Sequence, residues 1–129
     1  MNLVDSSGWL EYFGGGKNAN FFAPPIEDVK HLVIPAICFY EVFKKVLQQR
    51  NEGDALQVVA AMQQGKVIAL DEVVALQAAK LSFELKLPMV DSIILATAHQ
   101  HQAIIWTQDA DFKNIKGVKF IAAKSSSLF

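Results

Sequence analysis

The chain contains 129 residues, of which 52% are hydrophobic and 19% charged, and its formal net charge is −1. These proportions exclude a disordered chain and suffice for a compact domain with a buried core. No run approaches the ~18 apolar residues of a membrane-spanning helix, and no basic and apolar leader precedes Asp5, so we expect a cytoplasmic protein. The single cysteine, Cys38, lies in an apolar stretch and is expected to fill the core.

Short apolar runs alternate with longer helical segments along the chain. The apolar runs predict strands over residues 3–4, 32–34, 67–70, 103–107 and 118–121. The segments between them predict helices over residues 8–13, 19–30, 36–50, 55–64, 72–86 and 88–101. Ser6 or Ser7 is expected to cap the first helix, and Pro24-Pro25 to kink or restart the second. The serine run 125–127 is expected to be loosely packed.

The alternation of strands and helices indicates βαβ units, in which the strands are parallel and helices cover both faces of the sheet. We therefore expect one α/β domain over residues 1–129. Its predicted architecture is a three-layer α/β/α sandwich around a central parallel sheet of four to five strands.

Four acidic residues occupy equivalent places in this pattern. Asp5 follows the first predicted strand and Asp109 the fourth, whereas Glu41 and Asp91 lie in the first turns of helices. An α/β fold gathers such positions into one crevice beside the carboxyl ends of its strands. If these carboxylates converge, their mutual repulsion makes joint ionisation costly unless a cation lies among them.

Taken singly, each acid also has a plainer explanation. An aspartate after a strand is more often a helix cap than a metal ligand, which suits Asp5 and Asp109, and Asp91 could cap its own helix. Glu41 resists that explanation, because a carboxylate in the apolar start of a helix needs a partner if it is buried.

The chemistry of four such acids is that of a hard divalent cation. Oxygen ligands are what Mg²⁺ prefers, and it takes only a few carboxylates while it keeps several waters. A bound ion can lower the pKa of a water and neutralise charge in the transition state of phosphodiester hydrolysis. No histidine base is required, and the spacing of His31, His99 and His101 does not form a metal site.

Four segments of the chain carry a family resemblance: Val4-Asp5-Ser6-Ser7, Pro35-Ala36-Ile37 with Glu41, Asp91-Ser92-Ile93-Ile94-Leu95-Ala96-Thr97-Ala98, and Thr107-Gln108-Asp109-Ala110-Asp111-Phe112. In this order they resemble the PIN domain, specifically the VapC-type ribonuclease toxins. The last two segments are the more specific ones. The resemblance implies an endoribonuclease that depends on Mg²⁺ or Mn²⁺ and is the toxin of a type II toxin–antitoxin pair.

The resemblance also implies a role for each candidate site residue. Asp5, Glu41 and Asp91 match the acidic triad that holds the metal, and Asp109 matches a more variable fourth acid. Hydroxyl positions that hydrogen-bond the carboxylates or a metal-bound water are matched by Ser7 and Thr107. Asp111 is either a rival for the fourth acid or a cap of a short turn.

The basic residues are compatible with an RNA substrate. If the four candidate acids are left out of the count, nine acidic residues remain against twelve basic ones, so the rest of the protein around the site would carry a net positive charge. Lys44 lies on the helix that carries Glu41, and Lys113 lies shortly after Asp109. We expect these two lysines to hold RNA phosphates.

Protein partners are implied by the resemblance and by the aromatic residues. Eight of the thirteen aromatic residues fall in the first 43 positions, and a groove there could accept a helix of a partner. The resemblance implies a small cognate antitoxin and a homodimer. Two alternatives stay open, namely a PIN-domain nuclease that acts in RNA processing without being a toxin, and a catalytically idle PIN-like binding module.

Overall fold

The computed structural model describes residues 1–124 and 127–129, and it contains a five-stranded parallel sheet. The strands are β1 (Asn2–Val4), β2 (Leu32–Pro35), β3 (Lys66–Ile68), β4 (Ile104–Thr107) and β5 (Val118–Phe120). Their order across the sheet is β3-β2-β1-β4-β5, and every neighbouring pair is parallel. This architecture confirms the predicted α/β fold with a central parallel sheet.

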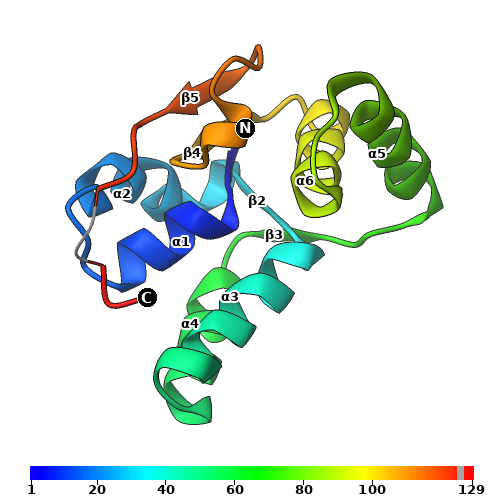
Figure 1. Ribbon diagram of the computed structural model, residues 1–129. Coiled ribbons are helices and arrows are strands. Elements are labelled where there is room, and N and C mark those ends of the chain that lie inside the picture. The colour runs from blue at the N-terminus through cyan, green and yellow to red at the C-terminus, as the bar shows by residue number, and fades with distance from the viewer. Residues whose placement is uncertain (125–126) are drawn as a thin grey trace.

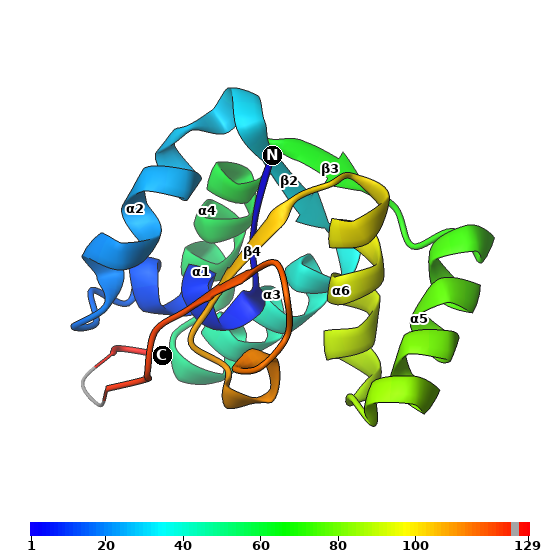
Figure 2. The same ribbon diagram turned by 90° about the horizontal axis from the view of Figure 1, so that it is seen from above.

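Helices connect consecutive strands and cover both faces of the sheet. They are α1 (Ser6–Phe13), α2 (Ala19–Glu27), α3 (Ala36–Gln49), α4 (Glu52–Met62), α5 (Glu72–Leu85) and α6 (Met89–Gln100), with the short 3-10 turns η1 (Val29–His31) and η2 (Ala110–Phe112). Helices α1 to α4 lie on one side and α5 and α6 on the other (Figures 1 and 2). Right-handed crossovers produce this division, because the chain moves one way from β1 to β3 and returns for β4.

The core lies on both sides of the central strands. Leu3, Val4, Val33, Ile34 and Ile105 are fully or almost fully buried, as expected of strands that helices cover on both faces. Cys38 belongs to the same buried cluster, and burial raises the pKa of its thiol far above the usual range. A neutral buried thiol fits the predicted role of core filling.

Several element boundaries differ from those predicted. Helix α1 starts at Ser6 because Asp5, and not a serine, caps it by accepting a hydrogen bond from the backbone nitrogen of Gly8. Helix α4 starts three residues earlier than predicted because the side chain of Asn51 caps it. Local side-chain hydrogen bonds therefore set these two helix starts.

Two other elements are shorter than predicted. Helix α2 continues through both prolines but ends at Glu27, and a separate 3-10 turn follows after Asp28. Strand β3 pairs only on one side, at the edge of the sheet, and spans three residues that are mostly exposed. In the serine run, residues 125 and 126 lie outside the described residues. No helix in the described part of the chain is long and apolar enough to cross a membrane.

The carboxyl ends of β1 and β4 lie next to each other. Val4 is in register with Trp106, and the backbone nitrogen of Asp5 donates to the carbonyl oxygen of Trp106 at 3.2 Å. Asp5, which follows β1, and Thr107, the last residue of β4, are thereby neighbours although they are 102 positions apart. This edge is also where a parallel sheet offers a crevice for ligands.

Candidate active site

The four candidate acids converge on one pocket of about 280 Å³ at this edge. Asp5 comes from the start of α1, Glu41 from α3, Asp91 from the first turn of α6, and Asp109 from the segment after β4. The pocket is also lined by Ser6, Ser7, Leu10, Lys45 and Ile94. Acids from four separate segments thus share one solvent-accessible space.

Asp5 is held in one orientation by three donors. Its side chain is 2% exposed. One carboxylate oxygen accepts from the Ser7 hydroxyl at 2.7 Å and from the Gly8 nitrogen at 3.0 Å, and the other accepts from the Thr107 hydroxyl at 2.5 Å. Burial raises the pKa of Asp5 to about 6 although these hydrogen bonds lower it, and the charge of Asp109 adds to the rise.

Asp91 shows a larger effect of the same kind. It is 9% exposed, and burial together with the charge of Asp109 raises its pKa to about 8, with smaller contributions from Asp111 and Asp5. Carboxylate oxygens of Asp91, Asp109 and Asp111 lie within 4.8 Å of one another. Acids at such a separation repel one another strongly when ionised.

The turn after β4 fixes Asp109 and Asp111. The Thr107 hydroxyl, which donates to Asp5, accepts from the backbone nitrogen of Asp109 at 2.9 Å. Asp109 in turn caps η2, since its carboxylate accepts from the backbone nitrogen of Asp111 at 2.9 Å. Asp109 lines the pocket, whereas Asp111 is exposed beside it.

Helix α3 brings one acid and one base to the pocket. Glu41 and Lys45 are half-buried, lie one turn apart on the same face and both line the pocket. Lys44 is exposed, and its ammonium nitrogen lies 3.5 Å from the Tyr40 hydroxyl. Lys113 is exposed at the end of η2. The prediction singled out Lys44 on this helix, whereas the spacing of four from Glu41 to Lys45 was the signal in the sequence that favoured Lys45.

The donor set suits a hard divalent cation. The converging groups are carboxylate and hydroxyl oxygens, and two of the acids, Asp5 and Asp91, are buried with raised pKa values. A cation would favour their ionised forms and relieve the repulsion. Protein residues that could hold such an ion are Asp5, Glu41, Asp91, Asp109 and Asp111.

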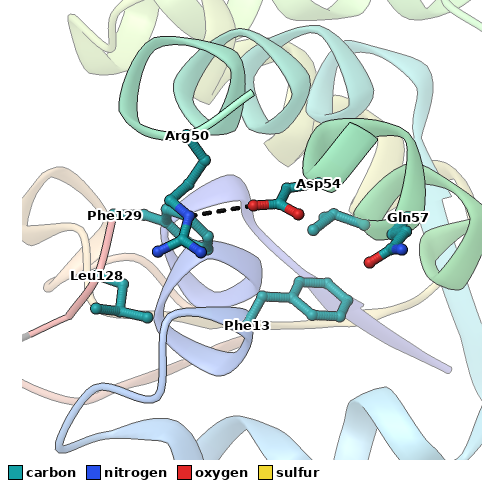
Figure 3. A pocket seen from close by; sticks show the side chains of 7 residues that line it. Phe13, Arg50, Asp54, Gln57, Leu128 and Phe129 are labelled. Carbon is teal, nitrogen blue, oxygen red and sulfur yellow. Dashed lines mark hydrogen bonds and ion pairs between the residues drawn. The ribbon is translucent and has the colours of Figure 1, made fainter. Parts of the chain in front are cut away.

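A second pocket, of about 340 Å³, lies between α1 and α4 (Figure 3). It is lined by Phe13, Arg50, Asp54, Gln57, Val58, Leu128 and Phe129. Its one acid, Asp54, accepts a hydrogen bond from Arg50 at 3.1 Å, as the dashed line in Figure 3 marks. Because that carboxylate already has a cationic partner, this pocket lacks the donor set of the first one.

The aromatic residues of the first two helices mostly pack inward. Trp9 and Phe22 are buried, and Tyr12, Phe13 and Phe21 are partly buried against the core. Among the described residues, exposed large apolar side chains gather instead on α5 and its flanks. They are Leu70, Val73, Leu76, Phe83, Leu85 and Met89, which we call the α5 patch.

Solved structures of similar fold were found for nearly the whole chain. One is a toxin–antitoxin complex from Klebsiella pneumoniae, with 26% identity, 92% of this chain and 96% of that chain covered, and a TM-score of 0.78. Another is VapC20 of Mycobacterium tuberculosis, a sarcin-ricin loop cleaving toxin, with 14% identity, 90% and 95% coverage and a TM-score of 0.74. The DNA-bound VapBC complex of Salmonella typhimurium matches with 16% identity, 95% and 98% coverage and a TM-score of 0.70.

The similarities at 14% and 16% identity are similarities of fold. A comparison with curated proteins found no match. The family model described as the PIN domain matches residues 3–118, which is most of the chain. The chain therefore belongs to the PIN domain family.

Proposed function

We propose that the protein is a Mg²⁺- or Mn²⁺-dependent endoribonuclease, the toxin of a type II toxin–antitoxin system, which hydrolyses phosphodiester bonds in RNA. The observation that carries the proposal is the convergence of Asp5, Glu41, Asp91 and Asp109, from four separate segments, on one pocket. Membership of the PIN domain family and the similarity to a toxin–antitoxin complex support it further.

In this proposal the four pocket acids hold the ion, and Asp111 adds a carboxylate oxygen from the rim. When bound, a divalent cation lowers the pKa of a coordinated water and neutralises charge that develops on the phosphate. The acids themselves stay ionised beside it. Ser7 and Thr107 keep the Asp5 carboxylate in one rotamer, so that its oxygens do not turn away from the pocket.

The lysines bind the substrate. Lys45 lies in the pocket among the acids, and we assign to it a non-bridging oxygen of the scissile phosphate. Lys44 and Lys113, which are exposed on either side, hold neighbouring phosphates of the RNA strand. These contacts are independent of sequence and set the register of the strand.

Two alternative functions share parts of the same site. A PIN-domain nuclease of RNA processing would use the same acids, and the similarity to a toxin–antitoxin complex favours the toxin. A short antitoxin-like reading frame directly upstream of the gene would favour it further. An idle binding module has no need for buried acids whose repulsion opposes ionisation, so the raised pKa values of Asp5 and Asp91 argue against it.

The proposed partners are a small antitoxin and a second copy of this chain, met in the cytoplasm. The α5 patch supports association, because Phe83 is 86% exposed and five more large apolar side chains on α5 and its flanks are exposed as well. A pocket of about 560 Å³ between α5 and α6 adjoins it, lined by Phe83, Met89 and Ile93 among others. We assign the α5 patch to the homodimer and the pocket between α1 and α4 to the antitoxin.

The test is cleavage of RNA by the purified protein with Mn²⁺ or Mg²⁺. Cleavage is expected to stop with chelator and to fall by about 10²-fold or more in Asp5→Asn. Asp71→Asn is the matched control, because Asp71 also caps a helix through a backbone nitrogen but does not line the pocket. Cleavage that survives both the chelator and Asp5→Asn would show that the carboxylates and their ion are not the catalyst.

A further inference from the structure

A third buried carboxylate, besides Asp5 and Asp91, lies on α1 outside the lining of the pocket. Glu11, on α1, is 2% exposed, and within the described residues no lysine, arginine or histidine pairs with it. Its oxygens accept from the backbone nitrogen of Asn18 at 2.7 Å and from the side-chain amide of Gln108 at 3.4 Å. A Cβ at Gly16 would collide with the same carboxylate, so the loop after α1 closes tightly over it.

Gln108 is the residue between Thr107 and Asp109, and its own contacts tie the turn to α1 and the following loop. Its side-chain oxygen accepts from the amide of Asn18 at 3.0 Å, while its amide donates to Glu11. The backbone nitrogen of Gln108 lies 3.4 Å from the Ser7 hydroxyl, which is the donor to Asp5.

Asn18 completes the network. It is 2% exposed, and its side-chain amide also donates to the carbonyl oxygen of Ala122 at 2.9 Å, beyond β5. Glu11, Asn18 and Gln108 therefore form a closed set of buried and half-buried hydrogen bonds that joins three segments. Such a set is costly to break, because each lost partner leaves a buried polar group unsatisfied.

We propose that Gln108, anchored by Glu11 and Asn18, is a positioning residue for the acidic pocket. The backbone of residues 107–109 is fixed on one side by the link from Thr107 to Asp5 and on the other by the Gln108 side chain. That double attachment sets where Asp109 and Asp111 lie relative to Asp91. The role of Gln108 rests on the proposed function in so far as those acids hold the ion.

The hydrogen-bond pattern allows a swap that keeps every bond. In Glu11→Gln/Gln108→Glu, the amide of the new glutamine would donate to the new glutamate, and its oxygen would accept from the Asn18 nitrogen. The new glutamate would accept from the Asn18 amide. Each single change leaves two donors or two acceptors facing each other, and the charge of the double variant equals that of the natural protein.

The experiment compares Glu11→Gln, Gln108→Met and the swap by Mn²⁺ affinity, cleavage kinetics and the amide NMR shifts of residues 109–111. We expect Glu11→Gln and Gln108→Met to weaken Mn²⁺ binding and lower kcat by about tenfold or more, with KM for RNA changed little. The swap restores both values and returns the shifts of residues 109–111 toward those of the natural protein.

The control is Asn51→Ala, which removes the cap of α4 remote from the pocket and shows what lost stability alone does. Natural Mn²⁺ affinity and kcat in Gln108→Met, losses no larger than in the control, or a swap that fails to restore function would overturn the role of Gln108. If the natural protein does not cleave RNA, the proposed function fails by itself. The NMR shifts then decide, and they are read in Glu11→Gln because Glu11 is 97 positions from Gln108. Unchanged shifts of residues 109–111 in that variant would overturn the positioning role, and displaced shifts would support it.

Discussion

Asp5 and Asp91 are two buried acids in one pocket. Both carboxylates are buried close to Asp109, and their pKa values rise to about 6 and about 8. One pKa unit corresponds to about 1.4 kcal/mol of difference between protonation states, so the ionised pocket costs stability when no ion is bound. A site that opposes its own ionisation is poised to gain from a cation.

The first prediction concerns the stability of the metal-free protein. A carboxyl whose pKa is raised by folding binds its proton more tightly in the native state, so stability falls as pH rises above about 4. We expect the free energy of unfolding to fall between pH 5 and pH 8. Asp91→Asn should flatten this fall and be more stable than the natural protein at pH 8 by roughly 2 kcal/mol.

Urea unfolding of both proteins at the two pH values, in metal-free buffer, measures the difference. Other titrating groups cancel in the comparison because they are common to both proteins. An Asp91→Asn variant that is less stable than the natural protein at pH 8, with the same dependence on pH, would contradict the assigned repulsion.

For single residues, the sequence was enough to predict which acids form the pocket, but not which side chains contact them. The positions of Asp5 and Asp109 after parallel strands were enough to predict their convergence. The choice between Asp109 and Asp111 depended on the geometry of one turn, and the structure brings both near Asp91. The partners of the buried Glu11 could not be predicted, because Gln108 is 97 positions away and its side chain carries no pattern of its own.

At the scale of elements, α3 is the helix that presents both signs of charge to the pocket. Glu41 and Lys45 share a face, and Lys44, one residue earlier, is turned toward Tyr40. A lysine among acids serves a purpose when an anionic substrate enters, since it then contacts a phosphate directly. Lys45 should therefore contribute more to RNA binding than Lys44.

The second prediction tests this ordering. Lys45→Glu should weaken RNA binding about tenfold at low salt. The plot of log affinity against log salt concentration should become less steep by about 1, which is the contribution of one phosphate contact. Lys44→Glu and Lys113→Glu should have smaller effects in the same direction. The measurement is fluorescence anisotropy of a labelled RNA in Ca²⁺, over a series of salt concentrations.

Lys66→Glu is the matched control for these charge reversals. Lys66 is the first residue of β3, so it lies at the amino ends of the parallel strands, whereas the pocket lies at their carboxyl ends. If Lys45→Glu and Lys66→Glu lose the same RNA affinity, only the overall charge of the protein matters, and α3 does not bind the RNA.

Helices and strands could be told apart in the sequence because their hydrophobic residues repeat with different periods. The residues at which each element begins and ends were harder to predict. The buried strands β1, β2 and β4 are short apolar runs, which mark them clearly in the sequence. The residue at which a helix starts depended on which nearby side chain accepts hydrogen bonds from the unpaired backbone nitrogens of the first helical turn. Asp5 and Asn51 do so here, whereas sequence alone offered serines and other polar residues equally.

At the scale of the whole molecule, strand order creates the site. β1 lies between β2 and β4, so the direction of the crossovers reverses beside β1, and the connections on the two faces of the sheet leave a crevice at the carboxyl ends of β1 and β4. The alternation of elements predicted a parallel sheet, but not this order, because many orders satisfy the same alternation. Pairings between strands about 100 positions apart, such as Leu3 with Ile105, are decided by the global packing.

The third prediction concerns association. If the α5 patch forms the homodimer, Phe83→Ser should weaken it by about tenfold or more, because a large aromatic side chain at the centre of an interface carries much of the binding energy. Leu56→Ser is the matched control, since Leu56 is an exposed apolar residue on α4, across the sheet. Light scattering after size-exclusion chromatography over a concentration series gives the dissociation constants. A dimer that survives Phe83→Ser but not Leu56→Ser would assign the interface to α4.

Mn²⁺ binding followed by electron paramagnetic resonance tests whether the converging acids hold a divalent cation, without reference to any substrate. The natural protein is expected to bind Mn²⁺ at neutral pH. Asp91→Asn should lose about tenfold or more in affinity, and Asp71→Asn should bind like the natural protein. A natural protein that leaves Mn²⁺ free in solution, or an Asp91→Asn variant with unchanged affinity, would contradict the account.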